Sequence, residues 1–170
     1  MRIISGIFRG KKILEPNDYK TRPLKDLTKE SVFNIINHSN KFKINLKNAN
    51  VLDLFSGVGS FGIECLSRGV IYVVFYENYN GVLPILKKNL KFLKNLENFK
   101  IVENDIYAKS AFLNLGFKFN IIFIDPPYKD KNLEPLLSRL KNSNIIHQDG
   151  IVILHRHKNE EIILPSNYKI

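Results

Sequence analysis

Asp125-Pro126-Pro127-Tyr128 combines an acid, two prolines and an aromatic ring directly after the apolar run at residues 121–124. The run has the composition of a buried strand, and proline fixes φ, so a rigid ledge is expected at a strand end. Asp125 and the Pro126 carbonyl can each accept one N–H of an aromatic amine, while Tyr128 stacks on its ring. Acceptors placed in this way stabilise positive charge developing on nitrogen, so the tetrapeptide predicts chemistry at the exocyclic amine of a nucleobase.

A second motif, Asp53-Leu54-Phe55-Ser56-Gly57-Val58-Gly59, turns from an apolar strand candidate into a helix candidate. Its glycines tolerate positive φ and let a ligand approach the backbone. With Gly62 the spacing also fits G-x-G-x-x-G, so the loop alone leaves a dinucleotide possible. A carboxylate at Asp53 would repel pyrophosphate and attract a sulfonium or amino group, which favours S-adenosylmethionine and predicts methyl transfer.

Acidic residues also follow the next two strand candidates. Glu77 is predicted to bind both ribose hydroxyls, and Asp105 to accept the adenine amino group while Ile106 packs on the ring. The structural alternatives are a cap of the turn for Asp53, a solvated strand end for Glu77 and a turn residue for Asp105. The predicted cofactor site comprises Asp53, Phe55, Ser56, Gly57, Gly59, Glu77, Asn78, Asp105 and Ile106.

Strand-like and helix-like segments alternate in βαβ order along most of the chain. Strands are expected at residues 50–55, 71–76, 100–103, 121–125 and 150–155. Helices are expected at residues 59–68, 81–96, 109–115 and 133–141. Continuous apolar strands favour an α/β, Rossmann-like fold, a mainly parallel sheet with helices on both faces. Since parallel strands end at one edge, the two motifs should meet there.

Residues 1–40 are predicted to form a short N-terminal extension, and residues 41–170 the catalytic domain. Within the extension, residues 2–14 indicate a hairpin that turns at Gly10, and residues 15–25 a loop. Asp26–His38 reads as a helix with Thr28 as its N-cap. Its expected apolar face contains Val32, Phe33, Ile35 and Ile36.

The balance of charge is strongly basic, with 26 Lys and Arg against 16 Asp and Glu and a net charge of +10. Such an excess favours phosphate polymers, although a Lys- and Asn-rich composition also reflects AT-rich coding. The few arginines are therefore the more informative cations, and Arg2, Arg9 and Arg22 are predicted to contact nucleic acid.

Length and composition are those of one soluble domain of 170 residues, 44% hydrophobic and 25% charged. No apolar stretch approaches the roughly 18 residues that span a bilayer, and the start lacks a signal peptide, so a cytoplasmic monomer is expected. Cys65 is the only cysteine and is expected to be a small buried hydrophobe. His155 and His157 lack a third ligand nearby, so no metal is expected.

The chain resembles the RsmD-type bacterial enzymes, which methylate the exocyclic N2 of a guanine in small-subunit ribosomal RNA. Besides the two motifs, the resemblance rests on Arg2-Ile3-Ile4-Ser5-Gly6, Arg9-Gly10-Lys11, Thr21-Arg22-Pro23, Asp26 and Lys29-Glu30-Ser31-Val32-Phe33-Asn34. It implies a class I S-adenosylmethionine-dependent methyltransferase whose substrate is an assembled small subunit rather than naked RNA. It also implies RNA contacts from the N-terminal segment, including Lys11 and Lys29.

The chain departs from the family pattern in places. Leu24 and Leu27 stand where Thr and Arg are usual, and lysines at 11 and 29 replace arginines. Lysine loses bidentate phosphate recognition, so weaker or redistributed RNA contacts are expected. The chain ends at Ile170, before the family's last antiparallel strands, which predicts an open sheet edge.

Two other functions remain open at this stage. An adenine-N6 DNA methyltransferase has a similar ledge, but such enzymes usually carry a target-recognition insertion that no segment here is long enough to provide. A non-catalytic RNA-binding assembly factor would keep the fold without the chemistry, which the intact Asp125 and Glu77 disfavour.

Overall fold

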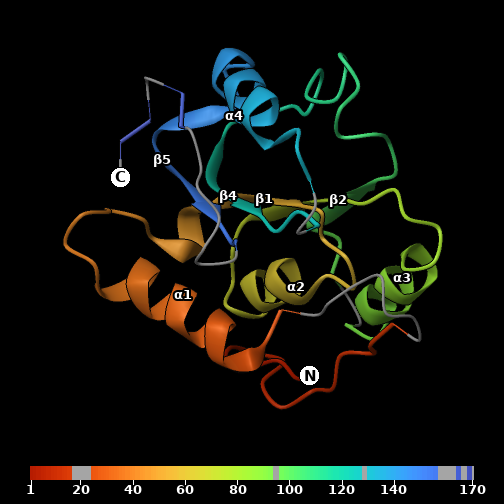
Figure 1. Ribbon diagram of the computed structural model, residues 1–170. Coiled ribbons are helices and arrows are strands. Elements are labelled where there is room, and N and C mark those ends of the chain that lie inside the picture. Colours follow the sequence, from red (N-terminus) through yellow and green to blue (C-terminus); the bar gives the residue numbers. More distant parts are fainter. Residues whose placement is uncertain (17–23, 94–95, 128–129, 157–163, 166–167, 170) are drawn as a thin grey trace.

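One five-stranded sheet forms the centre of the protein in the computed structural model, which describes residues 1–16, 24–93, 96–127, 130–156, 164–165 and 168–169 (Figure 1). The strand order is β3-β2-β1-β4-β5, and every neighbouring pair is parallel. The strands are β1 (Asn50–Leu54), β2 (Tyr72–Tyr76), β3 (Phe99–Val102), β4 (Phe119–Ile124) and β5 (Ile146–Leu154). The predicted α/β, Rossmann-like fold is confirmed.

Helices cover both faces of the sheet. Figure 1 shows α1 (Asp26–His38), α2 (Ser60–Ser67) and α3 (Leu83–Lys91) on one face and α4 (Leu133–Asn142) on the other. A short 3₁₀ helix, η1 (Leu46–Asn48), precedes β1. None of the described helices is long and apolar enough to cross a membrane.

Alternation along the strands divides the core into two clusters. Val51, Phe75 and Phe123 lie in the cluster under α1–α3, whereas Leu54 and Ile124 lie in the one under α4. Successive strand side chains point to opposite faces, so a continuous apolar run fills both clusters. The first cluster also holds Cys65, which is buried as predicted.

Some predicted elements are wrong in type or extent. Residues 109–115 form turns rather than a helix, since Ala111 and Leu113 donate to carbonyls three residues earlier and Asn114 has a φ of 60°. α3 ends at Lys91 instead of residue 96, and β5 begins at Ile146 instead of residue 150.

The helix at Asp26–His38 is present as expected, but its predicted cap and apolar face need correction. α1 follows Lys25 with no side-chain cap, so Thr28 lies within the helix. Ile35 is 57% exposed, while the buried positions include Lys29.

The N-terminal segment turns back on itself and runs across the end of α2. Arg2 and Lys12 form an antiparallel bridge, in agreement with the predicted hairpin. The Ile7 amide donates to the Ser67 carbonyl at 2.8 Å. Gly6, the residue before Ile7, has a φ of +84°, and a Cβ there would lie 1.8 Å from the Ser67 carbonyl oxygen. The close contact between the segment and α2 therefore requires glycine at this position.

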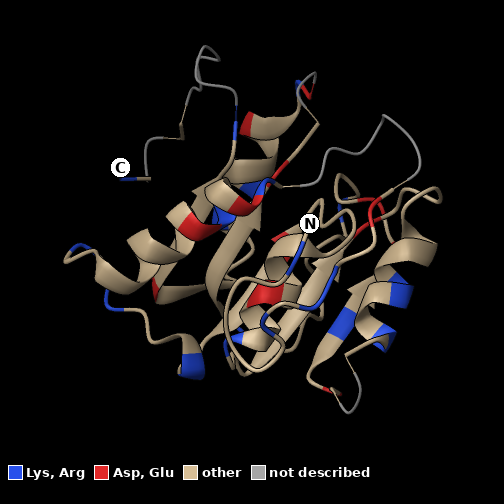
Figure 2. Ribbon diagram, turned by 90° about the horizontal axis from the view of Figure 1, so that it is seen from below, with Lys and Arg blue, Asp and Glu red and all other residues tan. Residues whose placement is uncertain are grey.

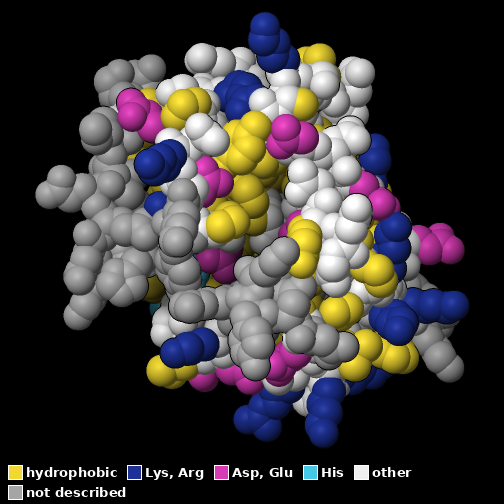
Figure 3. Space-filling model, turned by 45° about the vertical axis from the view of Figure 1, so that its right-hand side comes forward, with side chains coloured by type: hydrophobic (Ala, Val, Ile, Leu, Met, Phe, Trp, Pro, Cys, Tyr) yellow, Lys and Arg dark blue, Asp and Glu magenta, His cyan; other side chains and the backbone are white. Residues whose placement is uncertain are grey.

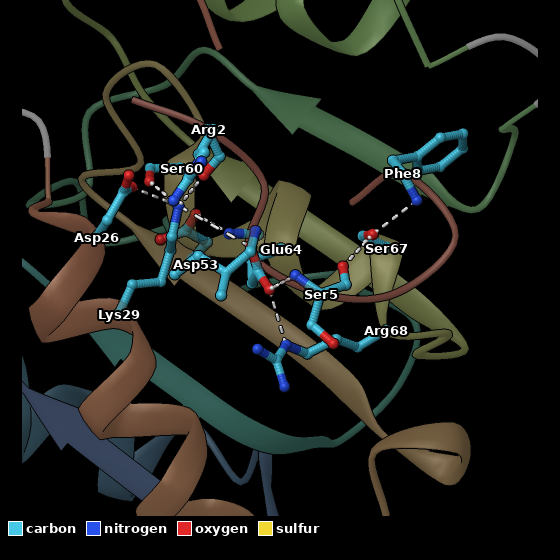
Figure 4. Close-up of polar contacts among 12 residues, drawn as sticks. Arg2, Ser5, Phe8, Asp26, Lys29, Asp53, Ser60, Glu64, Ser67 and Arg68 are labelled. Carbon is cyan, nitrogen blue, oxygen red and sulfur yellow. Dashed lines mark hydrogen bonds and ion pairs between the residues drawn. The ribbon is translucent and has the colours of Figure 1, made fainter. Parts of the chain in front are cut away.

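A buried polar group, here called the Glu64 cluster, fastens this segment to α2 (Figure 4). The Glu64 carboxylate accepts hydrogen bonds from the Ile4 amide at 2.8 Å and the Ser5 amide at 2.9 Å. Arg68 Nε donates to the same carboxylate at 2.9 Å. Lys29 Nζ donates to the Arg2 carbonyl at 2.9 Å and lies 3.9 Å from Glu64 Oε2. The charge of Glu64 is thus compensated by two backbone donors and two cations, as burial of a charge requires.

Replacing Gly6 by alanine should destabilise the protein strongly, because the new Cβ would overlap the Ser67 carbonyl. We expect a loss of roughly 3 kcal/mol in the free energy of unfolding by chemical denaturation. Gly10→Ala is the matched control, since Gly10 has the same φ of +84° with nothing within 4 Å of its Cβ position. The control should lose only about 1–2 kcal/mol from backbone strain. Equal losses in the two variants would contradict the close-contact explanation.

Candidate active site

The carboxyl ends of β1, β2 and β4 lie level with one another. Leu54 is in register with Tyr76 on one side and with Ile124 on the other. The Asp125 amide donates to the Leu54 carbonyl at 3.4 Å, so the tetrapeptide begins beside the glycine loop. The strand order reverses between β1 and β4, which is where open α/β sheets bind ligands. The structure therefore brings the two sequence motifs together.

The loop between β1 and α2 turns sharply through left-handed backbone conformations. The φ angles are 58° at Phe55, 55° at Gly57 and 84° at Gly59. For Phe55, which has a Cβ, such a conformation costs on the order of 1 kcal/mol or more. Hydrogen bonds from Ser56 to the Tyr76 carbonyl and from Gly57 to Glu77 hold the turn in place. The loop is nevertheless buried from Ser56 to Gly59, and a Cβ at Gly59 would lie 2.6 Å from Leu86 and 3.1 Å from Ile63, so packing against the core requires this glycine.

Glu77 is fixed in one orientation by backbone donors. Its Oε2 accepts from the Gly57 amide at 2.8 Å, and its Oε1 accepts from Asn78 at 2.9 Å and Tyr79 at 2.8 Å. The residue is half-buried at the end of β2, and its neighbour Asn78 is exposed. These three bonds occupy three of the about four acceptor positions of a carboxylate, so Oε2 keeps room for one further donor and Glu77 can accept one of the two predicted ribose hydroxyls.

Asp53 requires a correction. Its side chain is buried, and its Oδ2 accepts from the Gly62 amide at 2.9 Å. The carboxyl group therefore ties the end of β1 to α2 from inside the protein rather than facing a ligand. Burial, reinforced by the nearby Asp125 and Glu77 and opposed by the Gly62 N–H, raises the pKa of Asp53 to about 8.

The remaining predicted cofactor residues lie around the same edge. Asp105 is exposed, and its Oδ1 accepts from the Tyr107 amide at 2.9 Å. This contact is the one expected if Asp105 is a turn residue, which was the structural alternative to its cofactor role. Ile106 is 6% exposed and packs in the cluster under α4, which leaves little surface for an adenine ring. Phe55 is half-buried, with its ring centroid 6.1 Å from that of Tyr107. Ser56 is buried.

Asn89 supports the glycine loop from behind and was missed in the sequence. Its Nδ2 donates to the carbonyls of Val58 at 3.0 Å and Leu14 at 3.1 Å, and its Oδ1 accepts from the Leu14 amide at 2.8 Å. The signal was available, because Asn89 lies between Leu86 and Leu90 on the apolar face of α3. A polar side chain on such a face has to find partners inside the protein.

The ledge itself is built around a half-buried acid. Asp125 Oδ1 lies 2.8 Å from His155 Nδ1. Pro126 is buried and Pro127 exposed, and the Pro127 carbonyl accepts from Arg156 Nη1 at 3.1 Å. Burial raises the pKa of Asp125, while His155 and Arg156 oppose the rise. Tyr128 lies outside the described residues.

His155 and Arg156 were not predicted as part of this site. β5 pairs with β4 so that Leu154 lies opposite Ile124, which places the next residues, His155 and Asp125, side by side. The predicted strands end at Asp125 and His155, but the contact between these two residues could be predicted only if β4 and β5 were known to be neighbours. Figure 3 shows one side of the molecule, on which acidic side chains flank a patch of apolar ones.

The cations predicted to contact nucleic acid fall into three groups. Arg2, Arg9 and Lys11 are exposed on the N-terminal segment, and Arg22 lies outside the described residues. Lys29 is fully buried in the Glu64 cluster, so its prediction as a nucleic-acid contact is wrong for this conformation. Figure 2 shows Lys and Arg on several elements, α3 among them.

Within the described ranges no group of His, Cys, Asp and Glu could hold a metal ion.

The strand order, the glycine loop and the acidic ledge at the switch point define the class I methyltransferase fold. Solved methyltransferases share it at 17–18% identity with TM-scores of 0.59–0.62, such as a structure of SMU.776 and a caffeoyl-CoA O-methyltransferase-like protein from Staphylococcus aureus. Residues 1–170 match the family model described as "Conserved hypothetical protein 95". The chain belongs to this family, the RsmD family of methyltransferases.

Individual relatives agree with this assignment over nearly the whole chain. YlbH of Bacillus subtilis is 33% identical over 98% of this chain and 86% of its own length. Ribosomal RNA small subunit methyltransferase D of Buchnera aphidicola is 31% identical over 99% of this chain and 84% of its own. The solved structure of Escherichia coli YhhF is 29% identical, covers 99% of this chain and 88% of its own, and gives a TM-score of 0.81. The resemblance seen in the sequence is confirmed.

Asp53→Asn should make stability less dependent on pH. The pKa of Asp53 is about 8 in the folded protein and near 3.8 without the fold, so between these values the folded protein holds the extra proton. The free energy of unfolding should therefore fall as pH rises through this window, by up to about 1.4 kcal/mol per pH unit. Chemical denaturation at pH 5 and pH 7.5 measures the slope, which the variant should reduce.

Asp105→Asn is the matched control, because Asp105 is exposed in a turn and should leave the slope as it is. Identical slopes for Asp53→Asn and the wild type would show that the Asp53 carboxyl is ionised in the folded protein.

Proposed function

We propose that this protein transfers a methyl group from S-adenosylmethionine to the exocyclic N2 amine of a guanine in small-subunit ribosomal RNA. The observation that carries the proposal is the position of the Asp125 carboxylate, next to the glycine loop at the switch point of the sheet. The name of the Buchnera relative supports the choice of RNA. The chain contains both parts that the reaction needs: a loop that can bind the nucleoside of the cofactor, and a carboxylate that can accept an N–H of the amine.

The residues around the loop fit S-adenosylmethionine. In the left-handed turn at residues 55–59 only Phe55 is partly exposed, so the nucleoside would meet the loop at that residue, and Glu77 presents a fixed carboxylate to the ribose. Asp105 lies at the end of β3, where its second oxygen can accept the adenine amino group. The ionised carboxylates of this edge favour a cation over a pyrophosphate. When bound, the cofactor supplies an electrophilic methyl group on its sulfonium.

Activation of the amine falls to the ledge. The lone pair of an exocyclic amine is delocalised into the base, so the free amine is a poor nucleophile. Asp125 accepts one N–H through its carboxylate and the Pro126 carbonyl accepts the other, which favours a pyramidal nitrogen and stabilises its developing charge. Pro127 fixes the backbone, and Tyr128 stacks on the base and sets its plane. Positioning and electrostatics therefore carry the chemistry.

Residues 1–40 are assigned to RNA contact and residues 41–170 to catalysis. This division refers to function and not to packing, because Ile3, Ile13 and Phe33 lie in the same core cluster as residues of β1, β2 and β4. Arg2, Arg9 and Lys11 are exposed and free of any described salt bridge, so they are suited to phosphates. The proposed substrate is an assembled small subunit, met by a monomer in the cytoplasm.

Asp125→Ala should lower the rate of methyl transfer to small subunits by on the order of 10²–10³, because the amine loses its charged acceptor. The assay follows labelled methyl transfer from S-adenosylmethionine to assembled subunits, naked ribosomal RNA and DNA. A loss of only a few-fold would remove Asp125 from catalysis. Preference of the wild type for DNA would favour an adenine-N6 methyltransferase, and absence of transfer to any substrate would favour an assembly factor.

Arg9→Met should weaken binding to the subunit, because one phosphate contact is lost. The slope of the logarithm of the binding constant against the logarithm of salt concentration should become less steep by about one unit. Lys29→Met should instead cost about 3 kcal/mol of folding stability and leave the salt dependence unchanged, because Lys29 is buried beside Glu64. Binding titrations at several salt concentrations and denaturation curves separate the two effects. A reduced salt dependence for Lys29→Met would return this residue to the RNA interface.

A further inference from the structure

The side chain of His155 contacts the acid of the ledge directly. Its Nδ1 lies 2.8 Å from Asp125 Oδ1, and the two side chains are 33% and 26% exposed. The His155 amide also donates to the Ile124 carbonyl at 2.9 Å, so the residue continues the pairing of β5 with β4. The imidazole is thus anchored by the sheet rather than carried on a separate loop.

We propose that His155 is a positioning residue, which keeps Asp125 ionised and leaves the second carboxylate oxygen open to the substrate amine. The inference rests on the proposed function, because it assigns Asp125 as the amine acceptor. It adds a residue that acts through Asp125 and does not itself touch the base.

With Asp125 ionised, the proposal assigns a role to each of three polar atoms. An ionised carboxylate can only accept, so His155 Nδ1 carries the proton and donates it to Oδ1. Among the described residues nothing bonds to Asp125 Oδ2. Oδ1 is therefore occupied by the imidazole, and Oδ2 is the oxygen available to an N–H of the base.

The reaction needs this carboxylate in its ionised form. The amine lone pair forms the new N–C bond as the C–S bond breaks, and the sulfur keeps that electron pair. The nitrogen then carries a positive charge and must release one proton, which Asp125 Oδ2 can accept. A protonated Asp125 could neither stabilise that charge nor take the proton.

Burial opposes the ionisation of Asp125, and the hydrogen bond from His155 reduces this effect. Burial raises the pKa of Asp125, and the groups that oppose this are His155 and Arg156, both at the end of β5. From β1, the nearby Asp53 carboxyl has a pKa raised to about 8 by burial, so at neutral pH it is protonated and adds no charge beside Asp125. Arg156 donates to the Pro127 carbonyl, whereas His155 contacts the Asp125 carboxylate itself.

The test compares three substitutions of His155. Asparagine can place an amide N–H near the position of Nδ1, glutamine places the same group further out, near that of Nε2, and alanine provides no donor. His147→Asn, at the other end of β5, is the matched control. Titration of the Asp125 carboxyl carbon by NMR, assigned with Asp125→Asn, gives the first readout. The pH dependence of kcat for methyl transfer gives the second.

We expect His155→Ala to raise the pKa of Asp125 by roughly one further unit and to move the acid limb of the kcat profile by the same amount. His155→Asn should return both close to wild type, whereas His155→Gln should not. KM for S-adenosylmethionine should stay within about twofold, because the cofactor loop is not altered. His147→Asn should behave as wild type.

Unchanged Asp125 titration in His155→Ala would overturn the inference. Should the alanine variant fail to fold, the comparison of asparagine with glutamine decides in the same way, and equal behaviour of the two overturns it. The NMR readout needs no substrate, so it separates this inference from the proposed function. A wild type that methylates no RNA while the titration shifts as expected would refute the function and leave the His155–Asp125 coupling standing.

Discussion

The parallel register of β1 with its two neighbours is the constraint on which the site depends. Leu54 stands level with Tyr76 and Ile124, and the residues that follow these three positions are the glycine loop, Glu77 and the ledge. A shift of one residue would turn each apolar side chain to the opposite face. The two core clusters therefore fix the register, and packing far from the site determines where Asp125 lies.

The N-terminal segment is joined to the same structure through α2 and α3. Glu64 binds the amides of Ile4 and Ser5 from α2, and Asn89 binds Leu14 from α3 while also holding the Val58 carbonyl of the loop. Lys29 adds a contact of 3.3 Å to Ser60, the first residue of α2. The part of the chain assigned to RNA and the part that surrounds the cofactor are thus connected through buried polar side chains.

Most of the framework could be predicted from the sequence, because apolar runs and their order along the chain determine a parallel sheet. The burial of Lys29 could also have been predicted, because Lys29, Phe33 and Ile36 are spaced four and three residues apart on one side of α1. His155 could not be assigned without the strand order, because its partner is 30 residues away. The turns at residues 109–115 escaped prediction because local propensity there favours a helix, whereas the left-handed Asn114 ends the segment.

The strained turn after β1 has a consequence for the energetics of ligand binding. Phe55 has a φ of 58°, and Glu77, Tyr76 and Asn89 hold the neighbouring backbone. These contacts come from the fold itself, so the entropy of ordering the turn is lost on folding and not on association. Any ligand that binds beside this turn therefore meets a backbone that is already in place, and its affinity depends on the contacts it makes there.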